Sequence, residues 1–107
     1  MKTNLICVLL LSFFLVKMDA FAQKAVIKVA CVGNSITYGA NIPNRNKNIY
    51  PAQLQAYLGS DYEVRNYGIS GCTLLSKGDY PYVKTRAFAD SHTFQPDIVL
   101  IKLGTND

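Results

Sequence analysis

Ala25-Val26-Ile27-Lys28-Val29-Ala30-Cys31-Val32 is a run of apolar residues that only one lysine interrupts, and Gly33 ends it. A strand with one face in water alternates apolar and polar residues, whereas a strand covered on both faces is apolar almost throughout. The run is therefore typical of a buried strand in a parallel sheet. It predicts a fold in which helices lie on the faces of that sheet.

Downstream of this strand, predicted helices and strands alternate. Residues 50–59 predict a helix, because Pro51 suits its first turn and Gly59 suits its end. Residues 62–67 alternate in polarity and predict a second strand, shorter than the first and nearer an edge of the sheet. The other segments are a polar loop over 41–48, a loop over 68–81, a helix over 82–91 and a buried strand over 98–103. This order predicts one α/β domain over residues 23–107 with a parallel sheet.

The N-terminal segment has the features of a secretory signal peptide. Lys2 gives a positive start, residues 5–16 are apolar except for Ser12, and Ala20-Phe21-Ala22 offers small residues for cleavage before Gln23. The alternative, a membrane anchor, needs ~20 apolar residues to cross a bilayer, and this run is well short of that. We therefore expect residues 1–22 to be removed, and the protein to be secreted or periplasmic without stable membrane insertion.

Charge and cysteine content exclude several classes of function. The formal net charge of +4 comes without a cluster of lysine and arginine, so no nucleic-acid partner is indicated. The chain has one histidine and no Cys-x-x-Cys pair, so no metal site and no cofactor are expected. Cys31 and Cys72 could form a disulfide in an exported protein, but Cys31 lies in a buried strand, which favours ordinary packing.

Polar motifs follow each of the predicted strands. They are Gly33-Asn34-Ser35-Ile36-Thr37, then Asn66-Tyr67-Gly68-Ile69-Ser70-Gly71, and finally Gly104-Thr105-Asn106-Asp107. In open α/β sheets, ligands bind beyond the carboxyl ends of the strands. The motifs are therefore expected to converge at one edge of the sheet, and this convergence indicates a site there.

The residue types at this edge suit acyl transfer. A serine needs exposure on a tight turn to act as a nucleophile, and Ser35 follows a strand directly. The backbone N–H groups of Ser35 and Gly71, with the side-chain amide of Asn106, could bind the negative charge that develops on the carbonyl oxygen. Each residue also has a simpler interpretation: Ser35 as a helix cap, Gly71 as a turn glycine and Asn106 as a turn residue.

The base that would activate Ser35 is harder to assign. His92 is the single histidine, but it precedes the third strand and so belongs to the opposite end of the sheet. Asp107 either orients the pocket or only ends the chain. The tyrosines, which include Tyr38, Tyr67, Tyr80 and Tyr82, either line a substrate groove or pack in the core, and packing is the default.

These motifs resemble the first three sequence blocks of the SGNH, or GDSL-type, esterase family. The resemblance covers most of Lys28 to Asp107. It implies Ser35 as nucleophile and Gly71 and Asn106 as oxyanion donors, in a flavodoxin-like three-layer α/β/α fold of which this chain is the N-terminal half. It further implies hydrolysis of an O-acyl ester through an acyl-enzyme, without a metal. Within the family, the signal peptide and the motif from Gly33 to Gly39 are similar to those of secreted bacterial carbohydrate esterases, first sialate O-acetylesterase and next acetylxylan esterase. This resemblance implies an O-acetylated glycan such as sialic acid as substrate.

Two departures from the family pattern bear on activity. Asn34 stands where the family usually has an acidic residue, and an amide of the same size can still support a tight turn. The family's last block, Asp-x-x-His, does not occur in the sequence. We therefore expect the chain alone to be inactive and marginally folded, with the third strand as an apolar edge.

The alternatives are a non-catalytic glycan-binding relative, a non-functional one, and a flavodoxin-like nucleotide or phosphate binder. A nucleotide or phosphate binder would carry a glycine-rich phosphate loop, which the sequence lacks.

Overall fold

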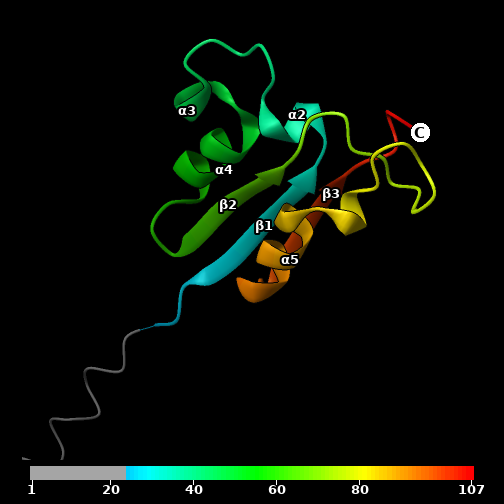
Figure 1. Ribbon diagram of the computed structural model, residues 1–107. Helices are drawn as coiled ribbons and strands as arrows, with labels where there is room; N and C mark the ends of the chain where they lie inside the picture. Colours follow the sequence, from blue (N-terminus) through cyan, green and yellow to red (C-terminus); the bar gives the residue numbers. More distant parts are fainter. Residues whose placement is uncertain (1–23) are drawn as a thin grey trace, which may run out of the picture.

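The computed structural model describes residues 24–107, and these form a parallel sheet with helices on both faces. The predicted signal peptide lies outside the described residues. The strands are β1 (Ile27–Gly33), β2 (Tyr62–Gly68) and β3 (Ile98–Lys102), in the order β2-β1-β3 with β1 in the middle (Figure 1). Both pairings are parallel. The predicted α/β fold is confirmed, and no helix within residues 24–107 is long and apolar enough to span a membrane.

The helices are short, and local sequence signals set their ends. Their bounds are α2 (Ser35–Tyr38), α3 (Arg45–Asn48), α4 (Tyr50–Leu58), the 3-10 helix η2 (Tyr82–Lys84) and α5 (Arg86–Thr93). Pro51 lies in the first turn of α4, where its missing N–H costs no hydrogen bond, and Gly59 follows the last residue with a φ of 78°. The Thr85 side chain caps α5 by accepting a hydrogen bond from the Phe88 N–H at 3.2 Å.

The helices form two layers with the sheet between them. Successive residues of a strand face opposite sides, so Cys31 and Val32 of β1 mark the two faces. The Cys31 side chain lies against Tyr50 of α4. Val32 packs with Tyr82 of η2 and Ala87 of α5. Helices α2 and α4 therefore cover one face, and η2 with α5 covers the other, as Figure 1 shows. This is the three-layer arrangement that the sequence predicts.

The main apolar cluster lies on the α5 face. It joins Val32, Cys72, Tyr82 and Ala87, with Tyr67 packed against it. The ring of Tyr82 is almost fully buried, and its hydroxyl donates a 2.6 Å hydrogen bond to the Tyr67 carbonyl oxygen. A buried hydroxyl needs such a partner, because an unpaired one would lose its hydrogen bonds to water without replacement. The cluster thereby ties the loop after β2 to the centre of the sheet.

The structure corrects the expected burial of the third strand. All five residues of β3 are exposed, including Ile101 at 66%. The reason is that β1 is the one strand beside β3 within residues 24–107, and no described helix packs over its outer part. The predicted unpaired apolar edge is thus present, but the predicted buried strand is wrong.

Three smaller corrections concern element bounds. β2 is at an edge as expected, but it has seven residues and is as long as β1. The helix expected over 82–91 is two pieces, η2 and α5, which extended backbone at Thr85 separates. The loop over 41–48 contains the single turn α3.

Candidate active site

Ser35 is the first residue of α2 and lies just beyond the end of β1. Asn34 caps this helix: its side-chain Oδ1 accepts a hydrogen bond from the Ile36 N–H at 3.2 Å, and its carbonyl accepts one from Tyr38 at 2.9 Å. Asn34 is fully buried, while Ser35 is partly exposed. A buried cap below an accessible serine hydroxyl is the local geometry that a nucleophile on a tight turn requires.

The turn onto Ser35 has room for glycine alone at its start. A Cβ at Gly33 would overlap Thr37 Oγ1 and would lie 2.7 Å from the Lys102 carbonyl oxygen. The Asn34 N–H donates to that same carbonyl at 3.2 Å, which ties the serine turn to the end of β3. The first motif is thus joined through backbone groups to the strand that leads into the third motif.

The register of the sheet brings the ends of all three strands to one edge. Gly33 pairs with Gly68 on one side and with Lys102 on the other. Ser35, Gly71 and Asn106 follow these residues within a few positions each. The structure therefore places the three predicted site segments at the same carboxyl edge of the sheet.

The second and third motifs also contact each other directly. Asn106 Nδ2 donates a 3.0 Å hydrogen bond to the Cys72 carbonyl oxygen. The Asp107 carboxylate accepts hydrogen bonds from the N–H groups of Leu74 and Leu75 at 2.7 and 3.1 Å. These bonds fasten the loop that carries Gly71 to the end of the chain. Since an amide nitrogen carries two hydrogens, Asn106 keeps a second donor for a ligand.

Two backbone donors at this edge have no partner within residues 24–107. Neither the Ser35 N–H nor the Gly71 N–H takes part in the backbone or side-chain hydrogen bonds of that range. Ser35 is at the first position of a helix, where the N–H has no intrahelical acceptor. Gly71 has a φ of 83°, a conformation that favours glycine, and it is exposed. Both groups can therefore donate to a bound ligand.

The Asn34 side chain has one unsatisfied atom. Its Nδ2 is buried and has no hydrogen-bond partner among the described residues, although Oδ1 caps the helix. An aspartate here would place an oxygen at the same point. The amide keeps the cap without adding a charge to this buried position.

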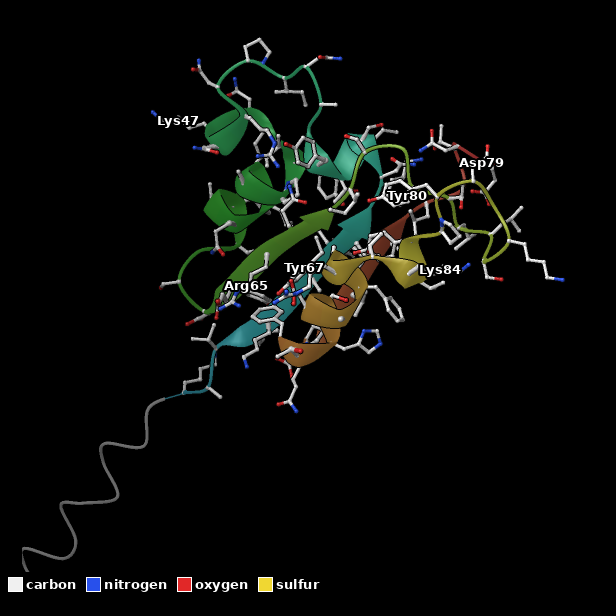
Figure 2. All side chains as sticks on the ribbon, in the orientation of Figure 1. Lys47, Arg65, Tyr67, Asp79, Tyr80 and Lys84 are labelled. Carbon is white, nitrogen blue, oxygen red and sulfur yellow. The ribbon has the colours of Figure 1, made fainter. Side chains whose placement is uncertain are left out.

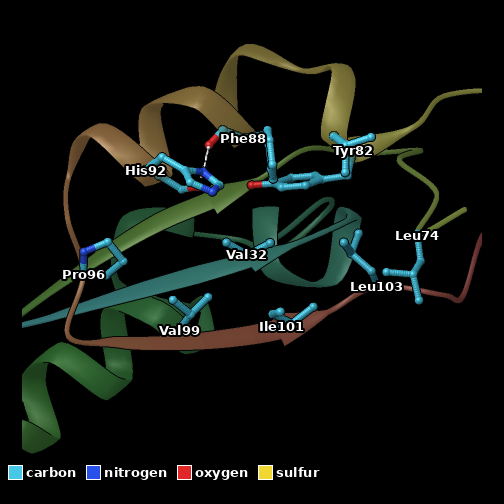
Figure 3. A pocket seen from close by; sticks show the side chains of 11 residues that line it. Val32, Leu74, Tyr82, Phe88, His92, Pro96, Val99, Ile101 and Leu103 are labelled. Atoms are coloured by element: carbon cyan, nitrogen blue, oxygen red, sulfur yellow. Dashed lines mark hydrogen bonds between the residues drawn. The ribbon is translucent and has the colours of Figure 1, made fainter. Parts of the chain in front are cut away.

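His92 lies away from Ser35. It is near the C-terminus of α5, where Nδ1 is 2.8 Å from the Phe88 carbonyl oxygen. Figure 3 shows it on the α5 side of an apolar groove of about 460 Å³, which Pro96 and Val99 also line. Val99 is near the amino end of β3, whereas the site edge is at the carboxyl ends. The prediction that His92 is not the base for Ser35 agrees with this placement.

The tyrosines divide between the core and the surface. Tyr67 and Tyr82 pack on the α5 face, and the Tyr67 ring centroid is 6.0 Å from that of Phe94. Tyr38 and Tyr80 are exposed at 40% and 49%. Figure 2 shows Tyr80 near the carboxyl ends of the strands. The default of packing is thus right for two of the four tyrosines.

Both cysteines within residues 24–107 are free and buried. Cys31 faces α4, whereas Cys72 belongs to the cluster on the α5 face, so the sheet separates them. Burial raises the pKa of both thiols, which keeps them protonated and unreactive. The favoured interpretation, packing without a disulfide, is confirmed for these residues. Within the same range, no cluster of three or more His, Cys, Asp or Glu side chains could hold a metal ion.

Sequence reasoning gave no role to Thr37, Tyr50 or Asn66, and the structure joins all three in one hydrogen-bonded group that includes the helix Ser35 begins. The Thr37 hydroxyl is 3.0 Å from the Tyr50 hydroxyl, and the Asn66 side chain donates to the Thr37 carbonyl at 2.8 Å. Burial raises the pKa of Tyr50, so its hydroxyl stays protonated. The available signal was the position of Asn66 near the end of a strand, as the first residue of the second motif.

Comparison with known proteins agrees with this geometry. Residues 31–107 match the model of the GDSL-like lipase/acylhydrolase family. The chain is also 57% identical over 85 residues to an acetylxylan esterase from Xylanibacter ruminicola, an alignment that covers 79% of this chain and 18% of that protein. The chain thus spans less than a fifth of the length of this relative. On the family match, the relative and the arrangement at the carboxyl edge, the chain belongs to the GDSL-like lipase/acylhydrolase family.

Proposed function

We propose that the protein is a carboxylic-ester hydrolase that removes O-acetyl groups from carbohydrate. Family membership supports ester hydrolysis, and the 57% identity to an acetylxylan esterase supports an acetylated polysaccharide as substrate. The observation that carries the proposal is the pair of unpaired N–H donors, Ser35 and Gly71, at the same sheet edge as an accessible serine hydroxyl.

In the proposed reaction, Ser35 Oγ attacks the acetyl carbonyl carbon while its proton passes to a base. The Ser35 and Gly71 N–H groups and the Asn106 amide donate to the oxygen that becomes negative. The C–O bond to the sugar then breaks, the sugar oxygen takes a proton, and the acetyl group stays on Ser35. Water attacks this acetyl-serine and releases acetate. Asn34 and Asp107 support the site by holding the serine turn and the Gly71 loop.

Acetylated xylan is the substrate that we place first. The identity to an acetylxylan esterase supports this substrate, whereas no further observation supports the sialate ester that the motif resemblance implied. Secretion or export to the periplasm, with removal of residues 1–22, is part of the same proposal, because a polymeric glycan would be met outside the cytoplasm. The mass of the N-terminal peptide of the exported protein tests the cleavage before Gln23.

The experiment uses the complete product of the gene, purified and assayed with acetylated xylo-oligosaccharide, O-acetyl sialic acid and a small alkyl acetate. Ser35→Ala is compared with Ser60→Ala, an exposed serine in the turn after α4. Loss of the nucleophile of a serine protease costs about 10⁶ in turnover, so we expect loss of at least about 10³-fold for Ser35→Ala and none for Ser60→Ala. Mass spectrometry after rapid quenching should find one acetyl group on Ser35.

Two outcomes would contradict the proposal. Hydrolysis that survives Ser35→Ala would place the chemistry elsewhere. Binding of acetylated oligosaccharide without hydrolysis would favour the non-catalytic glycan-binding alternative. Because His92 lies away from Ser35, we expect residues 1–107 alone to hydrolyse esters no faster than their own Ser35→Ala variant.

A further inference from the structure

The Asn66 side chain joins the serine turn to the strand that leads to Gly71. Its Nδ2 donates a 2.8 Å hydrogen bond to the carbonyl oxygen of Thr37, in the helix that Ser35 begins. Its Oδ1 accepts a 2.8 Å hydrogen bond from the Gly68 N–H, at the end of β2. One side chain thus bonds to both segments that carry the proposed nucleophile and the proposed oxyanion donor.

The backbones of these two segments are in direct contact. A Cβ at Gly68 would overlap the Tyr38 backbone nitrogen and lie 2.7 Å from the Thr37 carbonyl carbon. The end of β2 therefore packs its backbone directly against α2. Thr37 is fully buried against these strand ends, and its hydroxyl is bonded to that of Tyr50 in α4 at 3.0 Å. A single turn of helix held in this way can move only if one of these contacts breaks.

We propose that Asn66 is a positioning residue for the ester hydrolysis, which sets the place of Ser35 relative to the Gly71 N–H. The inference rests on the proposed function of Ser35. Asn66 does not touch the reacting atoms; it acts through the Thr37 carbonyl and the Gly68 N–H. Displacement of a reacting group by about 1 Å can cost about 10²-fold in rate, so a side chain that fixes this place has a large effect on turnover.

Substitutions can test the roles of Asn66 Oδ1 and Asn66 Nδ2 separately. Asn66→Asp keeps the shape and keeps an acceptor for the Gly68 N–H, but an ionised carboxylate puts an oxygen against the Thr37 carbonyl oxygen. Asn66→Ala removes both bonds. Asn46→Asp is the matched control, because Asn46 is an exposed residue of α3 and undergoes the same chemical change.

The experiment measures kcat, KM and Tm of the complete gene product with a small alkyl acetate, well below the lowest Tm. For Asn66→Asp at neutral pH we expect kcat to fall by about 10²-fold, with KM changed much less, because the small substrate is bound but attacked from a misplaced serine. Asn46→Asp should match the wild type. Asn66→Ala should also lower kcat, and it serves as the second variant if one of the two does not fold.

The pH profile gives a second readout that a purely structural role would not move. A carboxyl group that faces a carbonyl oxygen is disfavoured in its charged form, and once protonated it can donate to Thr37 as the amide did. The ratio of kcat for Asn66→Asp to kcat for the wild type should therefore rise as the pH falls. Asn66→Ala, which has no proton to gain, should show a flat ratio.

The outcomes separate this inference from the proposed function. If the wild type loses its hydrolysis in Ser35→Ala but Asn66→Asp and Asn66→Ala keep wild-type kcat and lose only Tm, Asn66 supports the fold and the inference is wrong. If the wild type shows no hydrolysis that depends on Ser35, the proposed function fails and the inference falls with it. A lower kcat with a ratio that rises at low pH for Asn66→Asp supports it.

Discussion

Two regions of the molecule differ in the opposite way from the usual rule that apolar residues are buried and polar residues are exposed. One is the junction at which α2 meets β1 and β2, and the other is the outer strand β3. At the junction the polar residues Asn34 and Thr37 are fully buried, whereas on β3 the apolar residue Ile101 is 66% exposed. At the junction, hydrogen bonds to Ile36 and Tyr50 replace those to water for Asn34 Oδ1 and Thr37 Oγ1, whereas Asn34 Nδ2 has no partner among the described residues. On β3, burial depends on what lies over the strand.

The difference teaches that contacts, and not polarity, locate the rigid part of this molecule. The serine turn is fixed by backbone packing at two glycines and by side-chain amides that are bonded at specific atoms. β3 is fixed to β1 by its ladder alone along most of its length. The following substitutions test this contrast.

The largest effect is expected for Gly68→Ala. The added Cβ would overlap the backbone of Tyr38, which cannot move without displacing α2. Overpacking typically costs about 1–3 kcal/mol in the free energy of unfolding, and a loss of about 3 kcal/mol is expected here because the contact is with backbone. Gly59→Ala is the control, because a Cβ there meets nothing within 4 Å and only the positive φ opposes it. Urea unfolding of both variants checks the order, and equal losses would mean that the junction is not tightly packed.

The next comparison uses two residues that are partners across the sheet. Val32 of β1 and Ile101 of β3 are in register on the same face, but Val32 is 8% exposed and Ile101 66%. Val32→Ala should lower the free energy of unfolding by about 2 kcal/mol, because it removes buried apolar area. Ile101→Ala should change it by less than about 0.5 kcal/mol. A cost for Ile101→Ala as large as that for Val32→Ala, measured in urea, would show that a further segment or partner covers β3.

A pH effect is expected from the core that lies on the α5 face. Burial raises the pKa of Tyr82 to about 12, from an ordinary value near 10. Between these values the unfolded chain loses the proton while the folded chain keeps it, so stability falls as pH rises from 10 to 12. The loss is roughly 2 kcal/mol.

Tyr82→Phe should reduce this dependence, at the cost of the hydrogen bond to Tyr67 at neutral pH. A smaller dependence should remain, because burial also raises the pKa values of Cys31, Cys72 and Tyr50. The check is the free energy of unfolding at pH 9, 10, 11 and 12 for both proteins. Parallel curves for wild type and variant would assign the pH dependence to other groups.

Much of the fold follows from patterns in the sequence. The apolar run that ends at Gly33 predicts β1, and the proline and glycine around residues 50–59 predict α4 almost to the residue. The place of β3 at an edge of the sheet was predicted, but the exposure of its faces could not be predicted from residues 98–103, which have the same apolar pattern as β1. A pattern reports what a strand can bury, and not whether another element lies over it.

The break between η2 and α5 could not be predicted from local helix propensity either. Thr85 can stand within a helix by its propensity, but its side chain caps the Phe88 N–H and its backbone is extended.

In the site, the motifs after each strand predict which segments meet, because parallel strands end at one edge. The bond from Asn66 to Thr37 joins residues 29 positions apart, and nothing in the local sequence marks that pair.

The smallest effect concerns the hydroxyl pair that joins α2 to α4. Thr37 Oγ1 and the Tyr50 hydroxyl are 3.0 Å apart, and Thr37 is fully buried. Thr37→Val keeps the shape and removes the bond, so it should cost about 1 kcal/mol in the free energy of unfolding. Thr93→Val is the control: Thr93 is exposed and its hydroxyl bonds only within its own helix, to Ala89.

A double-mutant cycle with Tyr50→Phe isolates the pair itself. If the hydroxyls act on each other, the loss in the double variant should be smaller than the sum of the two single losses, because the second substitution no longer breaks a bond. Additive losses would mean that each hydroxyl is satisfied elsewhere. In that case α2 would be held to the sheet mainly by Asn66 and the glycine contacts, and the hydroxyl pair would only fill the space between α2 and α4.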